Sequence, residues 1–190
     1  MEETSKKIRL LSSAYKLFTT KGFNKTTIQD IVDAARVAKG TFYLYFEDKY
    51  KLQEELIINK SLEIFNEAIV ELEKQNINKF DDQVIFIFDY VIDYLEKEPS
   101  ILNFISKDLS LGLYHEKLIN ILEGKETKIY DLFIKGAKEN NLKNPELTLF
   151  MIIEFVSSTI YSVLMKKIDI NIKDYKKYVH EIIKDMLKIK

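Results

Sequence analysis

The chain has 190 residues, of which 46% are apolar and 31% charged, with five glycines and two prolines; this composition favours a globular, helix-rich protein. Cysteine is absent and the two histidines, His115 and His180, are far apart, which excludes disulfide scaffolds, thiol nucleophiles and cysteine-ligated metals and leaves no metal-ligand pattern. Residues 4–51 hold ten Lys or Arg against four Asp or Glu, whereas residues 56–190 hold 19 against 22, so the basic N-terminal part suggests a polyanionic partner.

Two helices are predicted in the first 35 residues. The first ends near Lys21, where Gly22 can supply a left-handed cap. Steps of three and four residues predict its buried stripe as Ile8, Leu11, Tyr15 and Phe18. The second is short and begins after Thr27, because Asp30 stands three residues further on, as in a capping box. Its buried stripe is predicted as Ile28, Ile31, Val32 and Ala35.

A third segment, 38–46, contains five consecutive bulky apolar residues from Phe42 to Phe46. No second strand is predicted that could pair with it, so we expect a helix that buries Phe42 and Phe46, four residues apart, with Val37. Tyr43, Leu44 and Tyr45 then turn toward the sides and the outside. Two short helices joined by a tight break, the second basic at its start, make a candidate helix-turn-helix, and exposed aromatic residues on such a surface tend to mark function.

The rest of the chain is predicted to be helical as well. The expected helices cover about 49–74, capped by Glu47 and Asp48, then 80–97, 101–109, 116–140, 145–167 after an Asn144 cap, and 171–189. The acids of the helix over 80–97 favour a solvent-facing stripe, although Asp89 and Asp93 could instead meet a cationic ligand. Those acids are Asp82, Asp89, Asp93 and Glu96. We assign His115 and His180 to surface or packing roles.

The segments Thr26 to Ile31 and Val37 to Phe46, followed by Lys49 and Leu52, resemble the DNA-binding domain of the tetracycline-repressor (TetR) family. The resemblance covers roughly residues 4–60. It implies an all-α fold, with an N-terminal three-helix helix-turn-helix DNA-binding domain over 1–50 and a C-terminal helical ligand-binding and dimerisation domain over 51–190. Arg36 departs from the glycine that is usual in the turn, and a positive φ there costs a side chain roughly 1 kcal/mol.

The resemblance also implies roles for individual residues. The positions that face bases are Gln29, Lys39, Gly40, Thr41 and Leu44. The positions that contact phosphate are Thr27, Tyr43, Tyr45 and Lys49. The recognition segment holds no arginine, so the forked guanine contact is absent there and Lys39 is its one cationic base reader, while Thr41 and Leu44 can touch thymine methyl groups.

Two features of the C-terminal domain bear on partners. The helices near 145–167 and 171–189 could form an intersubunit four-helix bundle, as the resemblance favours, or could bury their apolar faces within one chain. The resemblance implies an apolar effector pocket. The residues themselves give less support for it, because aromatic residues at helical spacing more often form a core without a cavity. Its candidate lining is Phe65, Phe86, Tyr90, Phe104 and Phe133.

Together with these patterns, the resemblance implies a ligand-responsive bacterial transcriptional regulator, a repressor that binds pseudo-palindromic double-stranded operator DNA as a homodimer and is released by a hydrophobic or amphipathic small molecule. The alternative is a helical interaction protein without sequence-specific DNA binding. An enzyme ranks last, since no glycine-rich phosphate loop, nucleophile–base arrangement or metal cluster is visible, and no cofactor is expected. The longest unbroken apolar runs have five residues and no signal-peptide pattern is visible, so we expect a cytoplasmic protein without a membrane partner.

Overall fold

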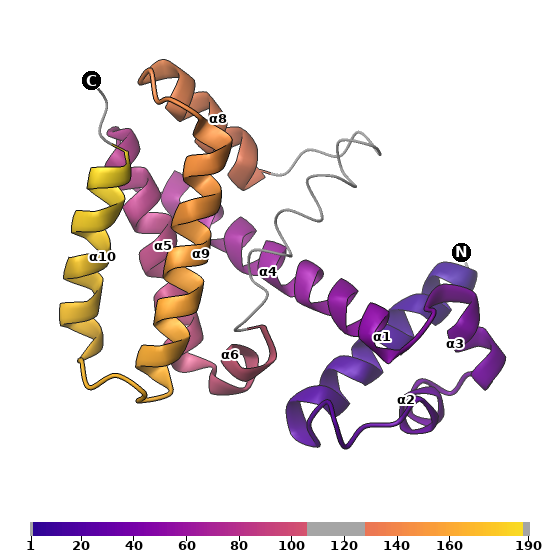
Figure 1. Cartoon of the computed structure of the whole chain (residues 1–190). Coiled ribbons are helices and arrows are strands. Elements are labelled where there is room, and N and C mark those ends of the chain that lie inside the picture. Colours follow the sequence, from indigo (N-terminus) through magenta and orange to yellow (C-terminus); the bar gives the residue numbers. More distant parts are fainter. Residues whose placement is uncertain (1, 106–127, 188–190) are drawn as a thin grey trace. The chain divides into compact units, whose positions relative to one another are not determined.

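The computed structural model describes residues 2–105 and 128–187, and within these ranges the regular structure is entirely α-helical (Figure 1). The all-α expectation is confirmed. The chain forms two compact units, an N-terminal unit Met1–Asn59 and a C-terminal unit Lys60–Lys190, and helix α4, Lys49–Glu73, contributes residues to both. Most of the predicted helix over 116–140, the end of the predicted helix over 101–109, and His115 lie outside the described residues.

The N-terminal unit contains α1 (Glu2–Thr20), α2 (Ile28–Ala35), α3 (Lys39–Tyr45) and the start of α4. On α1 the predicted stripe is partly wrong. Ile8 is 55% exposed, while Leu10, Ala14 and Phe18 are buried. Leu11 and Tyr15 are half-buried. Apolar residues occur on several sides of this helix, so the spacing of three and four fits two stripes, and packing against α2 and α3 decides which one is buried.

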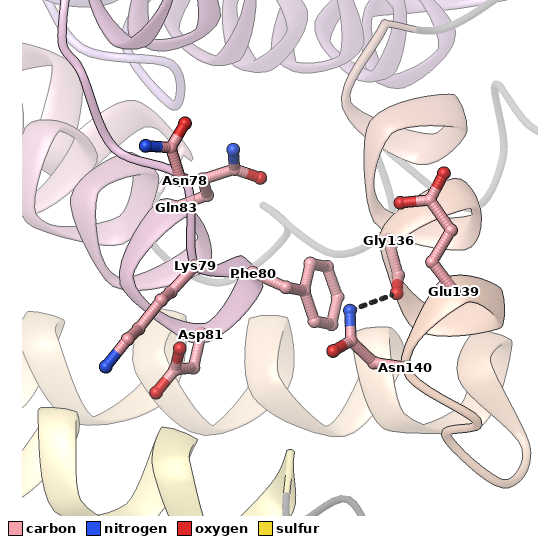
Figure 2. A pocket seen from close by; sticks show the side chains of 8 residues that line it. All are labelled: Asn78, Lys79, Phe80, Asp81, Gln83, Gly136, Glu139 and Asn140. Carbon is pink, nitrogen blue, oxygen red and sulfur yellow. Dashed lines mark hydrogen bonds between the residues drawn. The ribbon is translucent and has the colours of Figure 1, made fainter.

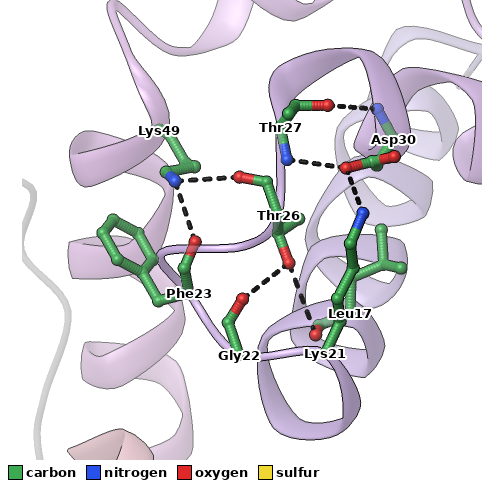
Figure 3. A network of polar contacts seen from close by, with 8 residues as sticks. All are labelled: Leu17, Lys21, Gly22, Phe23, Thr26, Thr27, Asp30 and Lys49. Atoms are coloured by element: carbon green, nitrogen blue, oxygen red, sulfur yellow. Dashed lines mark hydrogen bonds and ion pairs between the residues drawn. The ribbon is translucent and has the colours of Figure 1, made fainter.

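The capping box predicted at the start of α2 is confirmed. Thr27 Oγ1 accepts a hydrogen bond from the Asp30 backbone N–H at 3.1 Å, and Asp30 Oδ2 accepts one from the Thr27 N–H at 2.8 Å (Figure 3). Lys21 Nζ also donates to Asp30 Oδ2, at 2.7 Å. The bond from Lys21, followed by those from Thr27, lowers the pKa of Asp30 from 3.8 to about 2. The start of α2 is therefore held by a charged network.

The turn after α2 adopts the left-handed conformation. Arg36 has φ 55° and ψ 50°, and its N–H bonds to the carbonyls of Val32 and Asp33. The Val37 N–H also bonds to the Val32 carbonyl, at 3.0 Å. These bonds satisfy carbonyls that the end of a helix otherwise leaves without partners. A residue with a side chain thus stands where glycine would be free of strain.

We expect Arg36→Gly to raise the free energy of unfolding by about 1 kcal/mol, because glycine adopts this conformation without a Cβ penalty. Urea denaturation followed by circular dichroism measures the change. Arg36→Ala is the matched control: it removes the same charge but keeps the Cβ, so it should bring no such gain. An equal gain from both variants would assign the effect to the charge of Arg36 rather than to the backbone.

The C-terminal unit contains the rest of α4 with α5 (Phe80–Lys97), α6 (Pro99–Ile105), α8 (Lys128–Glu139), α9 (Pro145–Leu164) and α10 (Ile172–Met186). Helices α5, α9 and α10 contact one another, and α8 packs on α5 and α9 (Figure 1). Asn144 stands at the N-cap of α9 and Pro145 in its first turn, as predicted, but Asn144 has the left-handed φ of 49° and its side chain makes no capping bond.

The prediction of a solvent stripe on α5 is only partly right, because Glu96 is exposed but the other three acids, which are half-buried, pair with α10. Lys176 Nζ lies 2.6 Å from Asp93 Oδ1, and His180 Nε2 lies 2.9 Å from Asp89 Oδ1. Lys184 approaches Asp82 at 3.3 Å. The residue number on α5 increases from pair to pair while the number of its partner on α10 decreases. The two helices therefore run antiparallel, with complementary charges on the sides that face each other. Sequence periodicity shows a polar face but not which helix covers it.

Candidate nucleic-acid interface

Two buried phenylalanines fix the orientation of α3. Phe42 is 0% exposed and Phe46 is buried, and their ring centroids lie 5.6 Å apart. Residues four apart share one helix face, so this pair holds one side of α3 in the core of the N-terminal unit. The prediction that Phe42 and Phe46 are the buried members of the aromatic run is confirmed.

The opposite side of α3 faces solvent. Gly40 and Leu44 are four apart and, at about 100° per residue, lie opposite Phe42. Leu44 is 79% exposed, the largest value among the exposed large apolar side chains that the structure describes. By the same geometry Lys39 and Tyr43, both exposed, flank this strip on one side, and the half-buried Thr41 and Tyr45 flank it on the other. The predicted DNA-facing residues of α3 thus share one accessible surface.

Gly40 has no structural reason to be glycine. Its φ is not positive, and a Cβ placed on it would meet nothing within 4 Å. Glycine inside a helix costs about 0.5–1 kcal/mol relative to alanine. The fold therefore carries an avoidable cost at the exposed start of α3, and the residue offers a place where another molecule can approach the backbone closely.

We expect Gly40→Ala to stabilise the protein by about 0.5–1 kcal/mol while weakening its binding to DNA. Thermal melting and fluorescence anisotropy with labelled duplex measure the two effects. Gly22→Ala is a contrasting control, because Gly22 has φ 90° and any Cβ there is strained, so that variant should lose stability. A Gly40→Ala protein that binds DNA as tightly as the parent would contradict the close approach.

The DNA-facing candidates on α2 are accessible but already hydrogen-bonded. Thr27 is exposed with its Oγ1 committed to the capping box, and its hydroxyl can still donate. Gln29 is exposed, and its Nε2 donates to Asp33 Oδ1 at 2.8 Å. A base contact by Gln29 would use its remaining N–H or its oxygen, or would break this bond.

Lys49 has a structural task that sequence reasoning missed. Its Nζ donates to the carbonyls of Phe23 and Thr26, both at 2.8 Å, and lies 4.2 Å from the centroid of the Phe23 ring (Figure 3). These bonds tie the start of α4 to the segment that leads into α2. One N–H of the ammonium is left for a phosphate, so removing Lys49 would change both the local structure and any phosphate contact.

Tyr50, next to Lys49, is an exposed aromatic residue that the sequence reasoning did not select. Its ring packs edge-on against Phe23, with the centroids 5.1 Å apart. The rings of Phe23 and Phe18 are 5.0 Å apart, so Tyr50 extends a row of aromatic contacts from the core to the surface. Only its position beside a charged residue at a helix start could have drawn attention to it.

The aromatic residues proposed for an effector pocket make separate contacts within the C-terminal unit. Phe65 packs edge-on against Phe88 at 6.2 Å. Phe133 packs edge-on against Phe80 at 5.3 Å. The Tyr90 hydroxyl donates to Glu67 at 3.3 Å. Phe104 is buried and Phe86 half-buried.

A pocket of about 470 Å³ lies elsewhere in the C-terminal unit, between the start of α5 and the end of α8 (Figure 2). Its lining is mostly polar: Asn78, Lys79, Phe80, Asp81, Gln83, Gly136, Glu139 and Asn140. None of the five predicted pocket residues is among them. A Cβ on Gly136 would stand 2.3 Å from the Phe80 ring, so here glycine is needed for the packing of α5 against α8. Within the described residues, no three His, Asp or Glu side chains are placed to hold a metal ion.

The family model of the tetR family of bacterial regulatory proteins matches residues 10–56, which span most of α1, all of α2 and α3 and the start of α4. The helix-turn-helix in the N-terminal unit is therefore a tetR-family domain. Among the relatives, the HTH-type transcriptional regulator YuxN of Bacillus subtilis (strain 168) is 42% identical over 52 residues, which cover 27% of this chain and 17% of YuxN.

A second relative extends beyond the helix-turn-helix. IcaR of Staphylococcus aureus (strain Newman), the HTH-type negative transcriptional regulator of the biofilm operon icaADBC, is 24% identical over 91 residues, 48% of either chain. The chain therefore spans less than half the length of these curated relatives. The crystal structure of FadR from Bacillus subtilis in complex with stearoyl-CoA has a TM-score of 0.59 at 17% identity, covering 93% of this chain and 96% of FadR. That likeness shows the fold of both units.

Proposed function

We propose that this protein is a DNA-binding transcriptional repressor that places α3 in the major groove. The observation that carries the proposal is the strip of Gly40 and Leu44 on the solvent face of α3, where an apolar side chain is 79% exposed beside a glycine that the fold does not need. A binding partner that covers this strip would bury Leu44 and would approach the backbone at Gly40 closely, which explains both features. The tetR-family domain of the chain and the negative regulator among its relatives support the repressor role.

The residues around this strip fit the two kinds of contact that DNA recognition requires. Lys39, Thr41 and Leu44 can meet base edges, with Gly40 giving room and Gln29 reaching the groove edge from α2. Tyr43 and Tyr45 at the sides of α3, with Thr27 and Lys49, can donate to phosphate oxygens. The excess of basic over acidic residues between 4 and 51 supports attraction to a polyanion.

We propose further that the repressor is a homodimer through α9 and α10. Helix α9 is apolar enough, with a mean hydropathy of 1.8, to cross a membrane by length and composition, and only 39% of that stretch is buried. One side of α9 already lies in the protein core, whereas a helix surrounded by lipid would not need protein packed against it. On its other side Leu147 is 55% and Met151 is 48% exposed, and Tyr178 is exposed on α10. A second copy is the partner that would bury these residues without a membrane.

The effector we propose is a hydrophobic or amphipathic small molecule that releases the DNA, and the setting is the cytoplasm. The FadR structure contains stearoyl-CoA, which is an amphipathic ligand. The aromatic residues Phe65, Phe86, Tyr90, Phe104 and Phe133 remain the proposed lining. Helix α4 supplies residues to both units and so offers a continuous element through which ligand binding can influence α3. A thermal-shift screen of acyl compounds tests this part, and no shift with any of them would contradict it.

Selection of bound duplexes from a random pool with the full-length protein tests the DNA-reading function. We expect a pseudo-palindrome with half-sites about 34–36 Å apart or a multiple of that distance. Tyr43→Phe should weaken binding to all sequences alike, whereas Lys39→Ala should lose about 1–3 kcal/mol at one base pair and relax the preference there. Equal affinity for selected and random DNA would instead support the alternative function, a helical interaction protein without sequence-specific binding.

A further inference from the structure

The residues of the solvent-facing stripe of α9 are regularly spaced along the sequence. Six residues that are exposed or half-buried follow one another at intervals of four, three, four, three and four: Leu147, Met151, Glu154, Ser158, Tyr161 and Met165. This alternation keeps side chains along one line of a helix and is the spacing of helices that pack lengthwise on each other. The reverse side of α9 holds the buried residues Leu149, Ile152, Ile153, Val156, Ile160 and Val163.

We propose that α9 packs antiparallel against α9 of a second copy, with Glu154 of each chain hydrogen-bonded to Ser158 of the other. The proposal rests on the homodimer proposed above and adds its register and polarity. A twofold axis would cross the exposed stripe at the level of residue 156 along the helix, halfway between Glu154 and Ser158. In this register each chain contributes the same contacts, as a closed two-subunit interface requires.

The stripe is self-complementary in spacing and in chemistry. The series four, three, four, three, four reads the same in both directions, so an antiparallel copy aligns all six positions. Leu147 then faces Met165 of the partner, and Met151 faces Tyr161 of the partner, which pairs apolar side chains at both ends. The two polar side chains, Glu154 and Ser158, meet at the centre. No apolar residue of the stripe is left opposite a charge.

The central pair also solves a hydrogen-bonding problem. The Glu154 carboxylate is half-buried, and neither it nor the Ser158 hydroxyl has a side-chain hydrogen-bond or ion-pair partner among the residues that the structure describes. Covering the stripe would strip water from the carboxylate, so a donor must replace that water. In the antiparallel register the Ser158 hydroxyl of the partner donates to it. In a parallel register each Glu154 would face its own copy, and the two carboxylates would repel.

Cysteine cross-linking tests the register directly, because the chain has no cysteine of its own. Met151→Cys and Tyr161→Cys proteins, each with a single thiol, are oxidised alone and as a mixture. We expect a disulfide-linked dimer from the mixture only. Two copies of residue 151 would be about 15 Å apart along the antiparallel helices, too far for a disulfide. Cross-linking of Met151→Cys alone, with none in the mixture, would establish the parallel arrangement and overturn the proposal.

A charge exchange tests the central pair. Ser158→Glu should weaken the dimer at least about tenfold by placing it opposite Glu154 of the partner, while Ser158→Ala should weaken it less. Mixing Ser158→Glu with Glu154→Lys should produce heterodimers in excess of the statistical share in native mass spectrometry, with the melting temperature of each variant confirming its fold. Ser158→Glu homodimers as tight as the parent would overturn the pairing.

The outcomes separate this inference from the proposed function. A parent protein that sediments as a monomer at micromolar concentration would remove the dimer and the register together. A dimer that fails both tests would overturn only the α9 register, since DNA reading by α3 and dimerisation through other surfaces would stand. Binding of the monomer to lipid vesicles would assign the apolar stripe to a membrane and would also overturn the pairing.

Discussion

Replacing Phe42 by alanine should lower the free energy of unfolding by about 3–5 kcal/mol, as removal of a buried phenylalanine does in well-packed cores. Phe42 is 0% exposed and packs its ring against Phe46 at 5.6 Å, so no solvent can fill the space that the ring leaves. The loss is a large part of the stability of a small domain. DNA binding should fall with it, because the exposed residues of α3 are oriented only while its other side is buried. Urea denaturation followed by circular dichroism measures the change.

Leu44→Ala is the matched control for Phe42→Ala, because it removes a large apolar side chain from the same helix. Leu44 is 79% exposed, so its loss should change stability by no more than about 0.5 kcal/mol. It should nevertheless weaken binding to the selected DNA site. If Leu44→Ala destabilised the protein as much as Phe42→Ala does, the orientation of α3 described here would be wrong.

Local signals allowed much of the N-terminal unit to be predicted from sequence. The capping box of Thr27 and Asp30 depends on residues three apart, and the burial of Phe42 and Phe46 depends on residues four apart. The Asp48 cap is equally local, with Oδ1 accepting from the Lys51 N–H at 2.8 Å. Such contacts are set by helix geometry alone, so spacing in the sequence is sufficient evidence for them.

Contacts between distant segments could not be predicted in the same way. The wrong stripe on α1, with Ile8 exposed and Leu10 buried, arose because two sets of residues satisfy the same periodicity. His180 meets Asp89 across 91 positions of sequence, and nothing in a single sequence pairs them. In both cases the chemistry of each helix was visible, whereas the identity of its neighbour depends on tertiary packing.

The candidate site shows the same difference between local contacts and contacts across distant parts of the sequence. The outward direction of Leu44 and Tyr43 followed from the burial of their neighbours and is confirmed. The two carbonyls bound by Lys49 belong to Phe23 and Thr26, more than twenty positions away, and were not predictable. A cavity depends on how several helices are spaced, so the presence of aromatic residues alone could neither establish nor locate an effector site.

Replacing Met151 by aspartate should separate the homodimer that we propose. Met151 is 48% exposed on the isolated chain, so the substitution should leave the fold of the subunit intact. At the proposed interface it would bury two additional carboxylates, one per subunit, next to the two Glu154 side chains and opposite apolar partners. Charges buried without a partner are among the most costly changes to an interface. Sedimentation velocity should therefore show a monomer where the parent protein is a dimer.

The consequence for DNA binding is larger than the change at one side chain, because two linked recognition helices bind a palindrome far more tightly than one. We expect affinity for the full palindromic site to fall by about 10²–10⁴-fold, the usual range for the loss of a second linked contact. Affinity for a duplex that carries a single half-site should stay the same, since α3 is untouched. Met151→Leu is the control and should remain a dimer with parental affinity. A Met151→Asp protein that sediments as a dimer would place the subunit interface elsewhere. A monomer that binds the full site as tightly as the parent does would show that DNA recognition does not depend on pairing.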